Sequence, residues 1–353
     1  MAAETELNTS RKSQYFVRGA FRRFFAPALF SSVWLAVAGV VDSIFVGNRI
    51  GSAGLASIGF GQPVYLFFNI LSYGFSIGGS IHFASRLADG REEEANRIFL
   101  TVLRLLVCIY LLSAALGIIF LPQLMVFLGA DPADEITRTY IRTQLTFVPI
   151  MFCQGPFFYF VNADGDPGLA AAAMSISGAV DTLFSYIFIV LMGLGVRGSV
   201  YSTVVGAVLM LSISGSHIFR KKGALRFRGC RFDRRAVVLS ARTGFATASQ
   251  YLFQFITLIA VNHLLMRTAG QVAVASFDVI YNLSLLCAAI SDGVSIAIEP
   301  MLSSYRSERN LGNICTTLNL GLIWGGLFSS ILAAVLERKS NISLAMSGPV
   351  MVF

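Results

Sequence analysis

The sequence predicts an all-α fold, a polytopic membrane helix bundle. Hydrophobic residues make up 55% of the 353 residues, charged residues make up only 13%, and the mean hydropathy is +0.70. A soluble domain carries about a quarter charged residues, so this composition is typical of an integral membrane protein. The apolar residues form continuous runs rather than alternating with polar ones, which favours membrane helices over a β-barrel.

Nine apolar windows are long enough to cross ~30 Å of hydrocarbon as helices. In chain order they cover residues 24–46, 55–84, 98–121, 140–161, 168–191, 196–219, 240–265, 272–303 and 313–336. The second and eighth windows exceed one crossing, so we expect those helices to tilt, bend or protrude. Residues 1–23 are polar and basic, and the apolar run after them is too long for a signal peptide.

The basic residues predict the orientation of these helices. If the N-terminus is cytoplasmic, 19 of the 27 Lys and Arg residues lie on the cytoplasmic side, which follows the positive-inside rule. This bias explains the net charge of +8 better than nucleic-acid binding does, so no nucleic-acid partner is expected. The basic stretch from Arg220 to Arg242 also suits contact with anionic membrane lipid. We expect a multi-pass protein of the plasma membrane.

An internal repeat divides the chain into two lobes. An offset of 219 residues aligns two segments without gaps, with matches that include Ala56-Ser57 with Ala275-Ser276, Gly74 with Gly293 and Ser76-Ile77 with Ser295-Ile296. Six helices separate the copies, so the repeat is parallel, as in many secondary transporters. The predicted organisation is a six-helix lobe over 1–219, a basic cytoplasmic linker over 220–239, and an incomplete second lobe of about three helices over 240–353.

Five carboxylates interrupt windows that otherwise suit lipid-buried helices: Asp42, Asp181, Asp278, Asp292 and Glu299. An ionised group inside the bilayer is costly unless it faces a bundle interior or a wet cavity, so each is a candidate functional residue. Glu299 precedes Pro300 near a helix end, which favours contact with the interface or the linker.

Several short stretches, in this order and spacing, resemble the multidrug and toxic compound extrusion (MATE) family of cation-coupled efflux antiporters. They are Val41–Gly47, Gly54–Ala56 followed by Pro63, Phe127–Asp131, Asn162–Pro167, and Gly193–Gly198 followed by Thr203. The resemblance covers about residues 20–335. It implies twelve helices in two six-helix lobes around a central cavity, three helices more than this chain provides.

The resemblance also implies a cation-coupling site. The family's acidic residue in the first helix matches Asp42, and its hydroxyl in the sixth helix matches Thr203. In the fifth helix the family commonly has Asn and, four residues later, Asp. Here those positions hold Asp181 and Ser185, so the carboxylate lies one helical turn deeper.

The geometry of ideal helices allows these four residues to share one site. Asp181 and Ser185 are four residues apart and lie on one helix face. At ~1.5 Å per residue, Asp42 lies roughly 6 Å from the outer end of its window and Asp181 roughly 15 Å. Two carboxylates in a poorly hydrated pocket repel each other, so we expect one of them to hold a proton, or both to ligate Na⁺. A simpler interpretation of the shallow Asp42 is a helix-end charge.

Other polar residues are weaker candidates for the lining of a substrate cavity: Gln250, Gln254, Asn262, Asp278 and Asp292. Hydrogen bonds between helices explain polar residues at such positions equally well. The three histidines and five scattered cysteines have no ligand spacing, so no metal site and no cofactor is predicted beyond H⁺ or Na⁺ as the coupling ion.

The leading functional prediction is a proton- or Na⁺-coupled antiporter that exports drugs or other amphipathic organic compounds. One alternative is a lipid-linked saccharide flippase of related architecture, which should have more basic residues deep within its helices than Arg104 alone. Another alternative is a truncated membrane remnant that does not transport. An enzyme is not expected, because no nucleophile–base pair or phosphate-binding loop is evident.

Overall fold

The computed structural model describes residues 39–220, 223–227, 232–307 and 310–346, together with isolated positions between 17 and 37. Within these residues the regular structure is helical and no strand occurs. Eight of the described helices are long and apolar enough to cross a bilayer. The predicted all-α membrane bundle is therefore confirmed. Much of the first predicted window, 24–46, lies outside the described residues.

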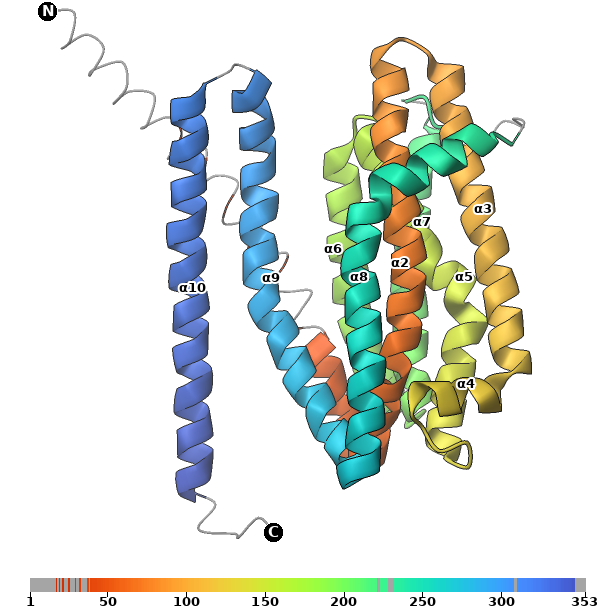
Figure 1. Ribbon diagram of the computed structural model, residues 1–353, viewed down its shortest axis with the longest axis vertical. Coiled ribbons are helices and arrows are strands. Elements are labelled where there is room, and N and C mark those ends of the chain that lie inside the picture. Colours follow the sequence, from red (N-terminus) through yellow and green to blue (C-terminus); the bar gives the residue numbers. More distant parts are fainter. Residues whose placement is uncertain are drawn as a thin grey trace, which may run out of the picture. The chain divides into compact units, whose positions relative to one another are not determined.

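The helices follow the predicted windows closely (Figure 1). A helix over 39–50 precedes α2 (Ser52–Ala88), α3 (Glu92–Ile119), α4 (Leu121–Leu128), α5 (Glu135–Ala163), α6 (Pro167–Ser185), the π-helix η1 (Tyr186–Leu191), α7 (Val196–Phe219), α8 (Arg234–Ala269), α9 (Gln271–Ser307) and α10 (Leu311–Met346). The short helix α4 and the π-helical end of the fifth window were not predicted. The bounds of α7 coincide with the predicted window 196–219.

Contacts divide the chain into two compact units. The larger unit is Val41–Ile280, and the smaller unit combines Met1–Val40 with Tyr281–Phe353. Helix α9 contributes to both units. The predicted division into lobes at the linker 220–239 stays a prediction.

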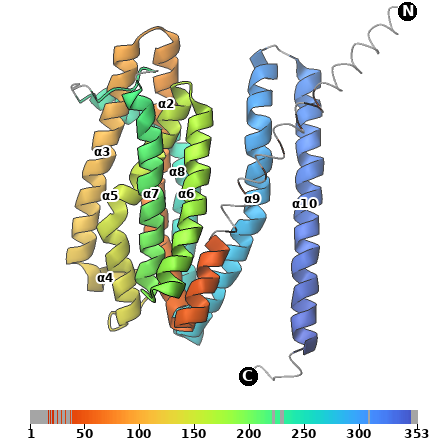
Figure 2. The ribbon, with the colours of Figure 1, turned by 180° about the vertical axis from the view of Figure 1, so that it is seen from behind.

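Helix α2 is the central element of the larger unit. It packs against α8, α5 and α3. Figure 1 shows α8 along one side of α2, and Figure 2 shows α6 and α7 from behind. The buried core around α2 is rich in aromatic rings, with Phe68 lying 5.3 Å from Phe152 and 5.9 Å from Tyr110 between ring centroids. Exposed apolar side chains such as Leu112 and Ile119 on α3 suit a lipid-facing surface.

Small residues allow α2 and α8 to cross with their backbones in contact. Gly74 and Gly78 on α2 face Ser240 and Gly244 on α8, and both pairs have a spacing of four residues. A Cβ atom at Gly78 would overlap the Ser240 carbonyl, and one at Gly244 would overlap the Gly74 carbonyl. This is the small-xxx-small packing found between membrane helices.

The smaller unit is held mainly by aromatic and glycine contacts between helices. The ring of Phe25 lies 6.1 Å from Trp324 and 5.9 Å from Phe328. Gly321 and Gly325 of α10 allow close approach to Val294 of α9.

Replacing Gly244 with Ala should destabilise the protein, because the new methyl group must push α8 away from α2. Overpacking of this kind costs about 1–3 kcal/mol, so the thermal unfolding temperature of the purified chain should fall by several degrees. Gly326→Ala is the matched control, because no heavy atom lies within 4 Å of the added Cβ. Equal unfolding temperatures for the two variants would contradict the close α2–α8 crossing.

Candidate functional site

The structure brings Asp42, Asp181, Ser185 and Thr203 together inside the larger unit. Asp42 comes from the helix over 39–50, Asp181 and Ser185 from α6, and Thr203 from α7. The first helix continues to residue 50 rather than ending at 46. Asp42 therefore lies roughly 12 Å from the end of its helix, about twice the depth expected from the sequence.

Hydroxyl groups from α6 and α7 surround the two carboxylates. Ser199 donates a hydrogen bond of 2.5 Å to Asp42 Oδ2, and Ser185 also lies within hydrogen-bonding reach of Asp42. Ser202 and Thr203 likewise lie within hydrogen-bonding reach of the Asp181 carboxylate. We call these six residues the acidic cluster: Asp42, Asp181, Ser185, Ser199, Ser202 and Thr203.

The hydroxyls of the acidic cluster also bond to one another and to the backbone. Ser185 donates to Ser202 Oγ at 2.7 Å, which joins α6 to α7. Ser202 and Thr203 both donate to the Ser199 carbonyl oxygen, at 2.7 and 3.2 Å. Because residues 199, 202 and 203 are three and four positions apart, they lie on the same face of α7.

Two local features distinguish α6 and α7 at the acidic cluster. Gly206 lets α7 approach α6 closely, because a Cβ there would lie 2.9 Å from the Ser177 carbonyl and 3.4 Å from Asp181 Cβ. Helix α6 then changes to the π-helix η1 immediately after Ser185. Single π-helical turns within α-helices occur frequently at functional sites.

The carboxylates of the acidic cluster have unused bonding capacity. Among the described residues, no side chain or backbone group hydrogen-bonds to Asp42 Oδ1 or Asp181 Oδ1, although both atoms are buried. The two carboxyl groups also interact electrostatically with each other. Two buried like charges are costly. A proton or a small hard cation between them would remove that repulsion and satisfy the free oxygens.

Tyr140 is a member of this region that sequence reasoning missed. Tyr140 on α5 is 9% exposed, and its hydroxyl group interacts electrostatically with Asp42, Asp181 and Asp278. Gly61 on α2 makes room for the ring, because a Cβ at that position would overlap it. Ser199 and Ser202 were missed as well, although their spacing relative to Thr203 was a usable signal.

The predicted cavity-lining residues differ in burial and are divided between the two units. Asn262 is fully buried and donates to the Gly59 carbonyl at 3.1 Å, and Asp278 lies beside the same glycine. Gln250 is exposed and Gln254 is half-buried on α8. Asp292 is exposed and belongs to the smaller unit. The side chain of Glu299 lies outside the described residues.

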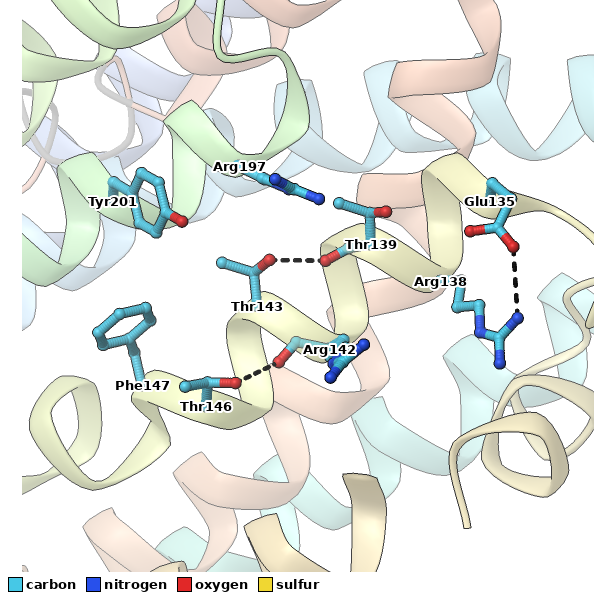
Figure 3. Close-up of a pocket in the computed structure, with 9 residues that line it drawn as sticks. All are labelled: Glu135, Arg138, Thr139, Arg142, Thr143, Thr146, Phe147, Arg197 and Tyr201. Carbon is cyan, nitrogen blue, oxygen red and sulfur yellow. Dashed lines mark hydrogen bonds and ion pairs between the residues drawn. The ribbon is translucent and has the colours of Figure 1, made fainter. Parts of the chain in front are cut away.

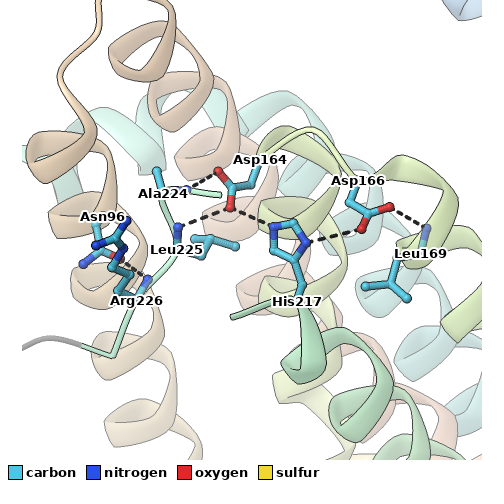
Figure 4. Close-up of polar contacts among 8 residues, drawn as sticks. All are labelled: Asn96, Asp164, Asp166, Leu169, His217, Ala224, Leu225 and Arg226. Carbon is cyan, nitrogen blue, oxygen red and sulfur yellow. Dashed lines mark hydrogen bonds and ion pairs between the residues drawn. The ribbon is translucent and has the colours of Figure 1, made fainter. Parts of the chain in front are cut away.

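A second buried polar group lies at the opposite end of α7, where the α7–α8 connection meets the α5–α6 turn (Figure 4). His217 Nε2 lies 2.9 Å from Asp164 Oδ2, and its Nδ1 lies 3.4 Å from Asp166 Oδ2. Asp164 also accepts hydrogen bonds from the backbone N–H groups of Ala224 and Leu225, at 2.9 and 3.2 Å. The histidine ring can donate to both carboxylates only as the imidazolium.

The turn between α5 and α6 caps the start of α6. Asp166 accepts a 3.2 Å hydrogen bond from Leu169 N, and Pro167 occupies the first turn of α6. Gly165 has a φ of 92°, a conformation that favours glycine. Within the part of the chain that the structure describes, no group of three or more His, Cys, Asp or Glu residues is arranged to hold a metal ion.

The fold and the acidic cluster define a multi-pass helical membrane protein with paired buried carboxylates. The MatE family model matches residues 27–187. One similar solved structure is that of the MATE multidrug transporter DinF-BH, determined as a complex. It has a TM-score of 0.75 to this chain and 20% sequence identity, and the match covers 94% of this chain and 75% of the DinF-BH chain. A multidrug resistance MATE family transporter in an inward-facing conformation has a TM-score of 0.72 and 19% sequence identity. That match covers 86% of this chain and 68% of the transporter's chain. The chain is therefore similar to the MATE family over residues 27–187, and it shares the fold of these solved transporters.

Two curated relatives are similar to this chain over part of its length. The probable multidrug resistance protein YoeA of Bacillus subtilis is 22% identical over 84% of this chain, and the FAD transporter of Shewanella oneidensis is 25% identical over 55%. The chain spans 66% of the length of YoeA and 44% of the length of the FAD transporter.

Replacing Asp164 with Ala should loosen the α7–α8 connection, because Ala224, Leu225 and His217 all lose their shared carboxylate partner. Trypsin should then cleave the purified chain between residues 220 and 235 several-fold faster than it cleaves the unchanged protein. Asp89→Ala, in the exposed turn after α2, serves as the control. Unchanged cleavage rates in the Asp164 variant would show that this carboxylate does not hold the connection.

Proposed function

We propose that the chain is a secondary transporter that exports amphipathic organic compounds from the cytoplasm in exchange for H⁺ or Na⁺. The acidic cluster is the observation that carries this proposal. It combines two buried carboxylates, four hydroxyl groups and two carboxylate oxygens without a protein partner among the described residues. Oxygen donors of this kind suit a proton or a hard monovalent cation.

The exchange follows from the electrostatics of the cluster. Without a bound cation, Asp42 and Asp181 repel each other, which favours separation of the helix over 39–50 from α6. A bound cation removes the repulsion and favours their close packing. If substrate binds better to one of these arrangements, the coupling is reciprocal, so substrate binding must weaken cation binding by the same factor.

Aromatic side chains near the cluster support an organic substrate. Tyr73 of α2 stacks on Tyr251 of α8 with ring centroids 5.1 Å apart, and it lies edge-on to Tyr159 of α5 at 5.9 Å. Tyr65, two turns earlier on α2, interacts electrostatically with Tyr73, Tyr251 and Asp181. Tyrosine faces bind organic cations and planar aromatic compounds. The substrate site would therefore lie next to the cation site.

The distribution of basic residues supports the orientation of this exchange. A cytoplasmic N-terminus in the plasma membrane places the basic α7–α8 connection and its Asp164–His217 contact on the cytoplasmic side. The acidic cluster is then nearer to the outer ends of α6 and α7. Cations would reach it from outside, down their gradient.

Asp181→Asn tests the proposal, because it preserves the shape of the side chain and removes its charge. Cells that express this variant should show a fall of at least about tenfold in ion-driven export of a fluorescent organic cation, equivalent to ~1.4 kcal/mol. Asp89→Asn removes an exposed carboxylate outside the cluster and should export normally. An uncoupler or Na⁺ removal should stop export by the unchanged chain.

Two results would count against the proposal. Export by the Asp181 variant at the unchanged rate would exclude the carboxylate from coupling. A lack of ion-driven export by the correctly inserted, unchanged chain would favour a membrane protein that does not transport.

A further inference from the structure

A second site lies on the other face of α7, in a cavity of about 570 Å³ between α5 and α7 (Figure 3). Three arginines line it: Arg138 and Arg142 from α5, and Arg197 from α7. Phe147 and Tyr201 line it further along α5 and α7 than these arginines, and three threonines of α5 complete the lining. We call this cavity the arginine pocket.

The charge of the arginine pocket is unbalanced. Glu135 is the single carboxylate in its lining, and it pairs with Arg138 at 3.3 Å. Both side chains of that pair are solvent-exposed. Within the described part of the chain, no carboxylate forms an ion pair with Arg142 or Arg197, although both arginines face the same cavity. The pocket therefore suits an anion that contacts two guanidinium groups at once.

Helix geometry fixes this arrangement. The α5 residues of the pocket are three or four positions apart and form one stripe along the helix, and Arg197 and Tyr201 are four positions apart on α7. Thr143 and Thr146 bond to carbonyl oxygens of their own helix, at 2.7 and 2.8 Å, which keeps the stripe compact. The rings of Phe147 and Tyr201 meet edge to face with centroids 5.8 Å apart.

The pocket changes from charged to apolar along the helix axis. From Glu135, at the start of α5, to Phe147 the stripe covers about 18 Å, which is enough to pass from the headgroup region into the hydrocarbon. An amphiphile with an anionic head and an apolar body would match both parts. The positive-inside rule does not explain these arginines, because they lie at the end of the bundle that has fewer basic residues.

We propose that the arginine pocket binds a phosphate-ester anion, with the headgroup phosphate between Arg142 and Arg197 and the apolar part against Phe147 and Tyr201. An anionic phospholipid of the surrounding membrane supplies this chemistry, and so does a water-soluble phosphate ester. The site is separate from the acidic cluster, since α7 directs Arg197 and Tyr201 to one face and Ser199 and Thr203 to another.

Native mass spectrometry of the full chain in neutral detergent tests this site. The unchanged protein should retain phosphatidylglycerol at least about tenfold more tightly than diacylglycerol with the same acyl chains, because only the former carries phosphate. Arg142→Gln with Arg197→Gln should remove this preference. Arg267→Gln removes an exposed arginine of α8 that does not line the pocket, and it should bind like the unchanged protein.

Glycerol 3-phosphate distinguishes the two sources of phosphate. If it displaces phosphatidylglycerol at similar concentrations, the pocket recognises the phosphate ester alone; if it does not, the pocket requires the lipid. The proposal is overturned if the double variant retains phosphatidylglycerol as well as the unchanged protein, or if diacylglycerol binds equally well. The single variant Arg197→Gln provides the same comparison if the double variant does not fold. None of these results depends on transport, so they are independent of the Asp181→Asn assay.

Discussion

The burial of two carboxylates in an apolar helix bundle is the constraint that organises this molecule. Asp42 and Asp181 come from different helices and interact electrostatically inside the larger unit. Ser185 and Ser199 bond within the same region, but one oxygen of each carboxylate has no partner among the described residues. Two ionised carboxylates at such a site repel each other, so we propose that a proton or a cation reduces its charge. The charge state would then control how closely the helices pack.

Close helix packing is what creates this environment, and small residues make it possible. Gly206 allows α7 to approach α6 beside Asp181, and Gly61 makes room for Tyr140. At the crossing of α2 and α8, Gly78 and Gly244 bring two backbones into contact. Helix α7 has two polar faces, since it contributes hydroxyls to the acidic cluster and Arg197 to the lining of the arginine pocket.

The sequence predicted much of the fold because hydrophobic length is a local property. The window 196–219 matched α7. The four residues suggested for the cluster lie together, although their role in coupling stays a prediction. The position of Tyr140 beside the acidic cluster, and of Arg142 and Arg197 in one pocket, depends on contacts between helices distant in sequence. Periodicity within one helix does not reveal such contacts. The four-residue spacing of Gly74 and Gly78 was a signal that could have predicted the α2–α8 crossing.

The most direct test of the central claim is the exchange of cation for substrate on the purified chain. The affinity for a fluorescent organic cation should be measured over a range of pH and of Na⁺ concentration, with the proton release determined by calorimetry in buffers of different ionisation enthalpy. We expect that raising the concentration of one of these ions weakens substrate binding, and that this ion is released when substrate binds. Substrate affinity that is independent of both pH and Na⁺ would contradict it.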